Sequence, residues 1–233
     1  MRNAVRIAWR EIRWEILGDR SAIVRMGIFA ILPLALVLTA RGSRMTEAAL
    51  FGLAFQSAVF PALSGVALIA STFTQEKENG TLIPLLASPV RDLDIVVGKL
   101  LGMMIPVLGV CIGSMTLYFW LAATQYGLTR VAEALPITSL YALVVIAFLY
   151  LLTAGSWVLI VAAMVKTSRA GQQIAGLLIA VSVAIFTGLG FVAANIASGW
   201  GLVVLGAVLV ASDVVALEIA RRVWRREEVL ARL

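Results

Sequence analysis

Residues Gln75–Lys99 read QEKENGTLIPLLASPVRDLDIVVGK and separate two long apolar stretches of a 233-residue chain. The flanking sequence is compatible with lipid, whereas this segment is rich in charges and contains glycine and proline. Charged side chains are costly inside a bilayer, so the segment must lie outside it. Three leucines on one side of the stretch predict a short amphipathic helix at the membrane surface. They are Leu82, Leu85 and Leu86. Such a helix is suited to contact a soluble partner.

The composition predicts an all-α polytopic membrane protein. The chain is 61% hydrophobic and 14% charged, and its mean hydropathy is +1.00. Since a span needs about 20 mainly apolar residues, the sequence predicts six transmembrane helices. They cover approximately residues 22–40, 48–73, 95–123, 137–165, 170–194 and 200–220. These spans use most of the chain, so we expect one transmembrane domain over residues 1–233.

The distribution of positive charge predicts the orientation. The net charge is +6, with 19 Lys and Arg residues. If the N-terminus is cytoplasmic, only Arg41, Arg44 and Arg130 face outward, and the other sixteen face inward. This asymmetry follows the positive-inside rule and predicts that both termini are cytoplasmic. We therefore expect a prokaryotic cytoplasmic (inner or plasma) membrane protein, whose basic residues contact lipid headgroups rather than nucleic acid.

The residue inventory argues against an enzyme. The sequence has no histidine, and Cys111 is its only cysteine, so the usual metal ligands and general bases are missing. Asp213 and Glu218 lie toward the inner half of the last span, near Arg221 and Arg222. No GxxxxGK[ST] phosphate-binding loop occurs in the sequence. We expect no catalytic residue, cofactor or metal in this chain, and any ATP and Mg²⁺ to be bound by another polypeptide.

Residues 4–20 predict an amphipathic helix that lies in the membrane interface before the first span. Apolar side chains gather on one face of this helix, and arginines gather roughly opposite. Trp9 and Trp14 are expected at headgroup depth. Two interpretations remain open: a membrane anchor that orients the first span, or an elbow helix that also borders a cytoplasmic partner.

Two strings of small residues predict close helix packing. The third span carries Gly98, Gly102, Gly109 and Gly113, which fall on one face of a helix. The fifth span carries Gly176, Ala180, Ala184 and Gly188. Small residues let membrane helices approach closely, either within one chain or between subunits. The sequence does not decide between these, nor whether residues 188–199 form a re-entrant hairpin.

The run E-K-E-x-G-T-L-x-x-L-L-A-x-P-V, followed by G-K at residues 98–99, resembles the loop between the second and third spans of type-2 ATP-binding-cassette (ABC) exporter permeases. In that family the loop forms a coupling helix that docks on a separate ATPase. The resemblance therefore implies a cytoplasmic coupling segment over residues 75–94. The implied coupling residues are Glu76, Glu78, Gly80, Thr81, Leu82, Leu85, Leu86, Pro89, Gly98 and Lys99.

The resemblance implies the transmembrane permease subunit of an ATP-driven exporter. Two copies of a cytoplasmic ABC ATPase and a second permease copy, identical or different, would complete the complex. Movement of the ATPases would drive alternating access. One departure concerns the coupling segment, because many family members place glutamate directly after the G-T-L triplet, where this chain has Ile83 and Pro84.

Three other interpretations are weighed against this one. A haem-export-type permease has a similar length and loop, although the missing histidines disfavour direct haem handling. A non-transporting membrane anchor for an ATPase would need the same contact segment. An intramembrane enzyme lacks a visible acid–base pair or metal site. The sequence does not identify the transported substrate or the pore-lining residues.

Overall fold

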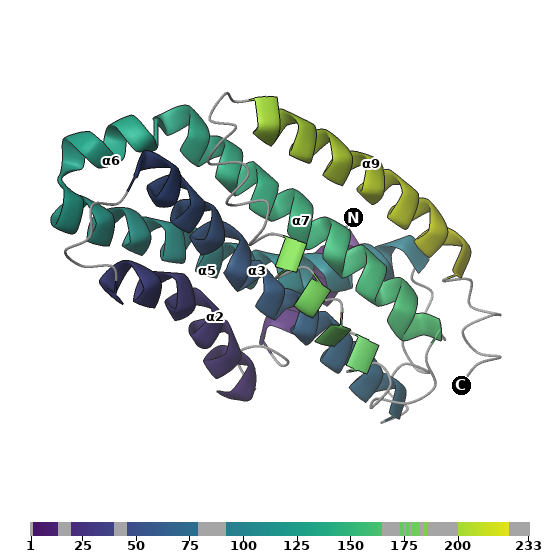
Figure 1. Cartoon of the computed structure of the whole chain (residues 1–233). Helices are drawn as coiled ribbons and strands as arrows, with labels where there is room; N and C mark the ends of the chain where they lie inside the picture. Colours follow the sequence, from purple (N-terminus) through teal and green to yellow (C-terminus); the bar gives the residue numbers. More distant parts are fainter. Residues whose placement is uncertain are drawn as a thin grey trace.

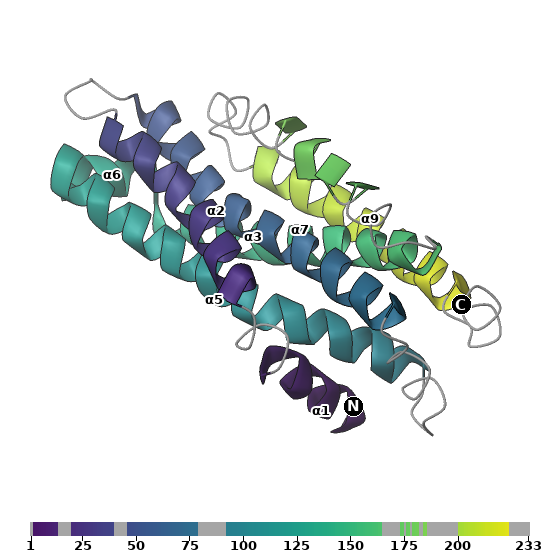
Figure 2. The same ribbon diagram turned by 90° about the horizontal axis from the view of Figure 1, so that it is seen from below.

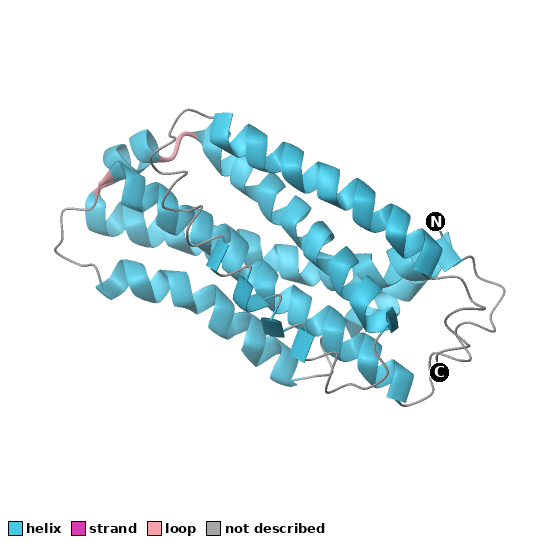
Figure 3. Cartoon of the chain, turned by 45° about the vertical axis from the view of Figure 1, so that its right-hand side comes forward, coloured by secondary structure: helices cyan, strands magenta, loops and turns pink. Residues whose placement is uncertain are grey.

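The computed structural model describes residues 2–13, 20–39, 46–78, 92–164 and 200–223, together with 173–174, 176–177, 179–181 and 184–185. In these residues the chain forms helices joined by short loops, with no strand (Figure 3). The principal helices follow in chain order (Figure 1). They are α1 (Arg2–Glu11), α2 (Arg20–Thr39), α3 (Glu47–Glu78), α5 (Asp92–Tyr126), α6 (Leu128–Ala134), α7 (Ile137–Met164) and α9 (Trp200–Val223).

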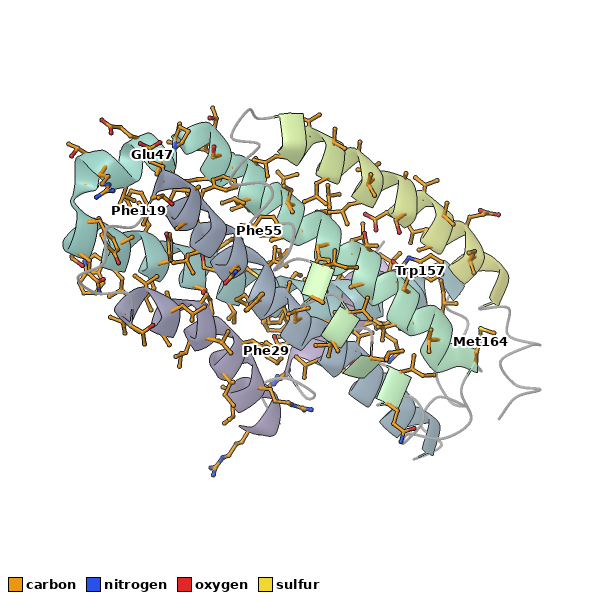
Figure 4. All side chains as sticks on the ribbon, in the orientation of Figure 1. Phe29, Glu47, Phe55, Phe119, Trp157 and Met164 are labelled. Atoms are coloured by element: carbon orange, nitrogen blue, oxygen red, sulfur yellow. The ribbon has the colours of Figure 1, made fainter. Side chains whose placement is uncertain are left out.

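Helix α3 is the centre of the bundle. It packs against α2, α5 and α7, whereas α9 covers one side of α7 (Figure 1). Its middle carries Ala54, Ala58 and Ala62 at four-residue spacing, and all three are buried. Small residues at this spacing let neighbouring backbones approach, which replaces the hydrophobic drive that is missing between helices in lipid. Phe55 fills the adjoining space and is fully buried (Figure 4).

Two glycines allow the closest approach at this centre. A Cβ atom placed on Gly65 of α3 would lie 2.8 Å from Cδ1 of Leu151 and 3.1 Å from Cγ2 of Val107. A Cβ atom on Gly155 of α7 would lie 2.9 Å from Cδ1 of Ile69. Helices α3, α5 and α7 therefore pack closely at Gly65 and Gly155 because glycine has no side chain to keep them apart.

Hydrogen bonds between helices fix their register. The phenol of Tyr118 on α5 donates to the carbonyl oxygen of Leu50 on α3 at 2.6 Å. The hydroxyl of Ser114, also on α5, donates to the carbonyl oxygen of Ala30 on α2 at 3.1 Å. Because the bilayer offers no water as an alternative partner, such polar groups must find partners inside the protein.

The observed helices agree in part with the six expected spans. Within the part of the chain that the structure describes, four helices are long and apolar enough to cross a membrane, and they lie within α3, α5, α7 and α9. The first expected span corresponds to α2, whose apolar part Ile23–Thr39 is shorter. Much of the fifth expected span, 170–194, lies outside the described residues, as does the proposed hairpin over 188–199. Six spans therefore remain a prediction.

The first half of the interfacial helix expected over residues 4–20 lies in α1, which ends at Glu11; residues 14–19 lie outside the described residues, so the full extent of this helix stays a prediction. The expected outer loop between the third and fourth spans contains α6. Gly127 precedes α6 with φ +90°, a left-handed conformation that glycine adopts without steric cost. The chain can therefore turn sharply between α5 and α6.

We predict that Gly65→Leu destabilises the bundle by roughly 1–3 kcal/mol, because the added side chain overpacks a filled core. Gly206→Leu is the matched control, since nothing lies within 4 Å of a Cβ atom at that position on α9. Thermal denaturation of both variants in lipid nanodiscs measures the difference. Equal melting temperatures would contradict the central position of α3.

Candidate functional site at the α1 end of the bundle

One end of the bundle brings together α1 and the helix ends that border the segment expected to contact a partner. Helix α3 ends at Glu78 and α5 begins at Asp92, while α1 lies alongside the first part of α5 (Figure 2). Helix α3 has 32 residues and α5 has 35. At 1.5 Å per residue each is about 50 Å long, which exceeds the roughly 30 Å hydrocarbon core. Both helices therefore extend beyond a bilayer.

The expected coupling residues fall into three groups. Glu76 and Glu78 belong to the last turn of α3. Gly98 and Lys99 lie near the start of α5, and both are buried. The remaining six lie outside the described residues. They are Gly80, Thr81, Leu82, Leu85, Leu86 and Pro89.

Lys99 forms an ion pair within the chain. Its Nζ atom donates a hydrogen bond to Oε1 of Glu11 on α1 at 3.2 Å. The Lys99 side chain is 5% exposed and that of Glu11 is 0% exposed, so water hardly reaches the contact. Arg10 approaches the same oxygen at 3.4 Å from the exposed side of α1. An opposite charge in direct contact is what makes two buried ions tolerable.

The pair depends on a close backbone approach at Gly102. A Cβ atom placed on Gly102 would lie 2.7 Å from Cβ of Glu11 and 3.0 Å from the carbonyl oxygen of Ala8. The buried face of α1 consists of Ile7, Ala8 and Glu11, whereas Trp9 is 65% exposed. Helix α1 thus presents one stripe to α5 and leaves its tryptophan on the outer surface, as expected of an interfacial helix.

The other small residues singled out in the sequence occupy more open positions. Gly109 and Gly113 continue the face of Gly102 along α5, but nothing lies within 4 Å of a Cβ atom at either position. The same is true of Gly176. Ala180 and Ala184 are exposed, and Gly188 lies outside the described residues. Of the glycines in this set whose surroundings are described, Gly102 meets a neighbouring helix closely, and Gly109, Gly113 and Gly176 do not.

A second polar contact joins α7 and α9. The hydroxyl of Thr153 donates to Oδ1 of Asp213 at 2.6 Å, and Nε1 of Trp157 donates to Oγ of Ser212 at 3.1 Å (Figure 4 labels Trp157). Oδ2 of Asp213 is buried and has no hydrogen-bond partner in the structure as described. This contact lies within the apolar spans, away from the α1–α5 contact.

The comparison with known families decides the identity. The family model described as ABC-2 family transporter protein matches residues 25–208, which is most of the chain. The chain belongs to the ABC-2 transporter family. A search of curated proteins found no match.

Membership makes this protein a membrane component of an ABC transporter. It is a multi-pass permease subunit, and the family implies association with a cytoplasmic ATPase subunit. The permease family is not itself catalytic. Among the described residues, no group of three or more His, Cys, Asp or Glu side chains lies close enough together to hold a metal ion.

Sequence reasoning singled out Asp213 but not its partner Thr153, and it assigned no role to Glu11. A signal for Glu11 does exist. Ile7, Ala8 and Glu11 share one helical face, and a carboxylate on an apolar face indicates a partner of opposite charge.

We predict that Gly102→Leu displaces α1 from α5, because the new side chain meets backbone atoms of Ala8 rather than a flexible side chain. Gly109→Leu, on the same face of the same helix, is the matched control and should leave the isolated subunit unchanged. Limited proteolysis in detergent measures the release of α1. Similar cleavage of the two variants would contradict the close approach at Gly102.

Proposed function

We propose that this chain is the permease subunit of an ATP-driven exporter, working as a dimer with two cytoplasmic ABC ATPase subunits. The family match is the observation that supports this best, because its range, 25–208, includes the whole of the Gln75–Lys99 segment. The coupling motif is therefore embedded in a chain whose family is established, instead of standing alone.

The proposed mechanism uses the length of α3 and α5. The coupling segment lies between their ends, and both helices continue through the bundle. Closure of the ATPases on ATP displaces the segment, and stiff helices carry the displacement into the apolar core. Packed interfaces respond by switching between discrete arrangements. The bundle then opens toward the outside, and the cargo leaves in that direction.

The proposed orientation places the coupling segment and both termini in the cytoplasm. It rests on the asymmetry of Lys and Arg residues along the chain. The end of the bundle that carries α1 is then cytoplasmic, and α6 lies outside. Among the described residues, Asp213 and Lys99 are the buried charged side chains of the apolar spans, and the other buried polar side chains are uncharged, such as Ser57 and Ser114. This scarcity of buried charge suits amphipathic or hydrophobic cargo better than small ions.

We predict that Leu85→Asp abolishes association with the ATPase while membrane insertion stays normal, because a charge then replaces an apolar docking contact. The permease is co-expressed with an ABC ATPase of the same organism, and co-purification and ATP hydrolysis are measured in lipid nanodiscs. Leu128→Asp is the matched control, since Leu128 is exposed on α6 at the other end of the bundle. A complex that forms normally with Leu85→Asp would refute the coupling assignment. A stable complex whose rate of ATP hydrolysis is not stimulated by substrates in membrane extracts would support the anchor interpretation instead.

Orientation gives a second test. We predict that a reporter that works only outside the cytoplasm is active when fused after Arg130 and inactive when fused after Lys166. A reporter that works only in the cytoplasm should give the opposite result. The positive charge on each side of the membrane is the physical reason. The reverse pattern would overturn both the orientation and the direction of transport.

A further inference from the structure

Lys99 is buried and forms an ion pair with Glu11 within this chain. The resemblance to exporter permeases assigned Lys99 to the coupling residues that act on the ATPase. In the structure its side chain is 5% exposed, and its ammonium group contacts Glu11 of α1. A side chain buried to this extent has little surface left for a second protein.

The ion pair lies where it can transmit movement of the coupling segment to α1. Lys99 is the eighth residue of α5, whose first residue, Asp92, belongs to the expected coupling segment 75–94. Glu11 is the last residue of α1. The ion pair therefore connects the end of one helix to the first turns of another that are 88 positions apart in sequence.

Three features make this connection stiff. The paired atoms lie 3.2 Å apart in a site that excludes water, so their attraction is only weakly screened. The missing side chain at Gly102 lets the backbone of Ala8 touch α5 directly. Oε1 of Glu11 accepts hydrogen bonds from Lys99 and from Arg10, whereas Oε2 is buried and has no hydrogen-bond partner among the described residues. Separating α1 from α5 would take the Lys99 ammonium away from this buried carboxylate, which is costly.

We propose that the Glu11–Lys99 ion pair makes α1 and the first turns of α5 move as one body, so that displacement of the coupling segment reaches the membrane surface through α1. Lys99 is a positioning residue that acts through Glu11. The inference deepens the proposed function and depends on it only for the force that moves α5.

The test measures the α1–α5 distance directly. Spin labels replace the exposed residues Trp9 and Val97 in a chain carrying Cys111→Ala, because Cys111 is the only native cysteine. Short-range dipolar spectra are recorded for the subunit in nanodiscs, alone and in complex with the ATPase, before and after addition of ATP and Mg²⁺. The variants are Glu11→Gln, the exchange Glu11→Lys with Lys99→Glu, and Arg6→Gln as a control at an exposed position of α1.

In the spin-labelled chain with Glu11 and Lys99 intact, we expect one narrow distribution of distances between the labels, and we expect ATP and Mg²⁺ not to change it. Glu11→Gln should broaden it, the exchange variant should restore it, and Arg6→Gln should have no effect. In the complex, the Glu11→Gln permease should still bind the ATPase. Its stimulation of ATP hydrolysis by the ATPase should be roughly tenfold lower, a typical size for a coupling between sites. The exchange variant should restore the stimulation, which a loss of folded protein alone would not predict.

Two outcomes would overturn the inference. One is a distance that changes with nucleotide while the ion pair is intact, and the other is a Glu11→Gln spectrum identical to that of the unaltered pair. If Glu11→Gln yields no folded protein, the exchange variant decides, because it keeps both charges. If neither the unaltered chain nor any variant binds an ATPase, the proposed function fails. The spectra of the subunit alone still show whether the ion pair holds α1 on α5.

Discussion

Close packing without help from water is the constraint on which this bundle depends. Lipid tails are as apolar as the side chains of α2, α7 or α9, so burial against another helix brings no hydrophobic gain. Close packing has to replace it. The buried alanines of α3 and the glycines Gly65 and Gly155 let side chains of neighbouring helices approach the backbone closely, and α2, α5 and α7 pack around α3. Each helix then needs few polar contacts to fix its register, as Tyr118 and Ser114 show.

The same constraint explains why the polar contacts lie where they do. An unpartnered charge in a low-dielectric setting is costly, so a buried acid needs a donor from a neighbouring helix. Asp213 finds the hydroxyl of Thr153, and Glu11 finds the ammonium of Lys99. The first contact joins two helices inside the apolar region. The second joins a surface helix to the start of α5, next to the segment that we propose as the ATPase contact, and so has a direct consequence for coupling.

Much of this could be read from the sequence because it depends on neighbouring residues. Long apolar stretches determine where helices cross a membrane, so α3, α5, α7 and α9 match the expected spans closely. The motif that starts at Glu76 indicated the family that the match over residues 25–208 then established. Side-chain partners were harder to predict. The periodicity of residues 4–20 suggested that arginines gather on one face of the first helix, and local sequence did not identify Lys99 as the partner of Glu11.

The sequence by itself determined the class of the protein, its apolar helices and its family, because hydropathy and short motifs are local properties of the chain. Only the tertiary structure decided which small residues bring helices together and which charges meet. Gly102 and Gly109 are equivalent on a helical wheel, yet α1 covers one and leaves the other open. The motif marks Lys99 as a coupling residue, and only the tertiary structure places Glu11, distant in sequence, beside it. Contacts between distant segments depend on how whole helices pack, and local sequence does not encode that arrangement.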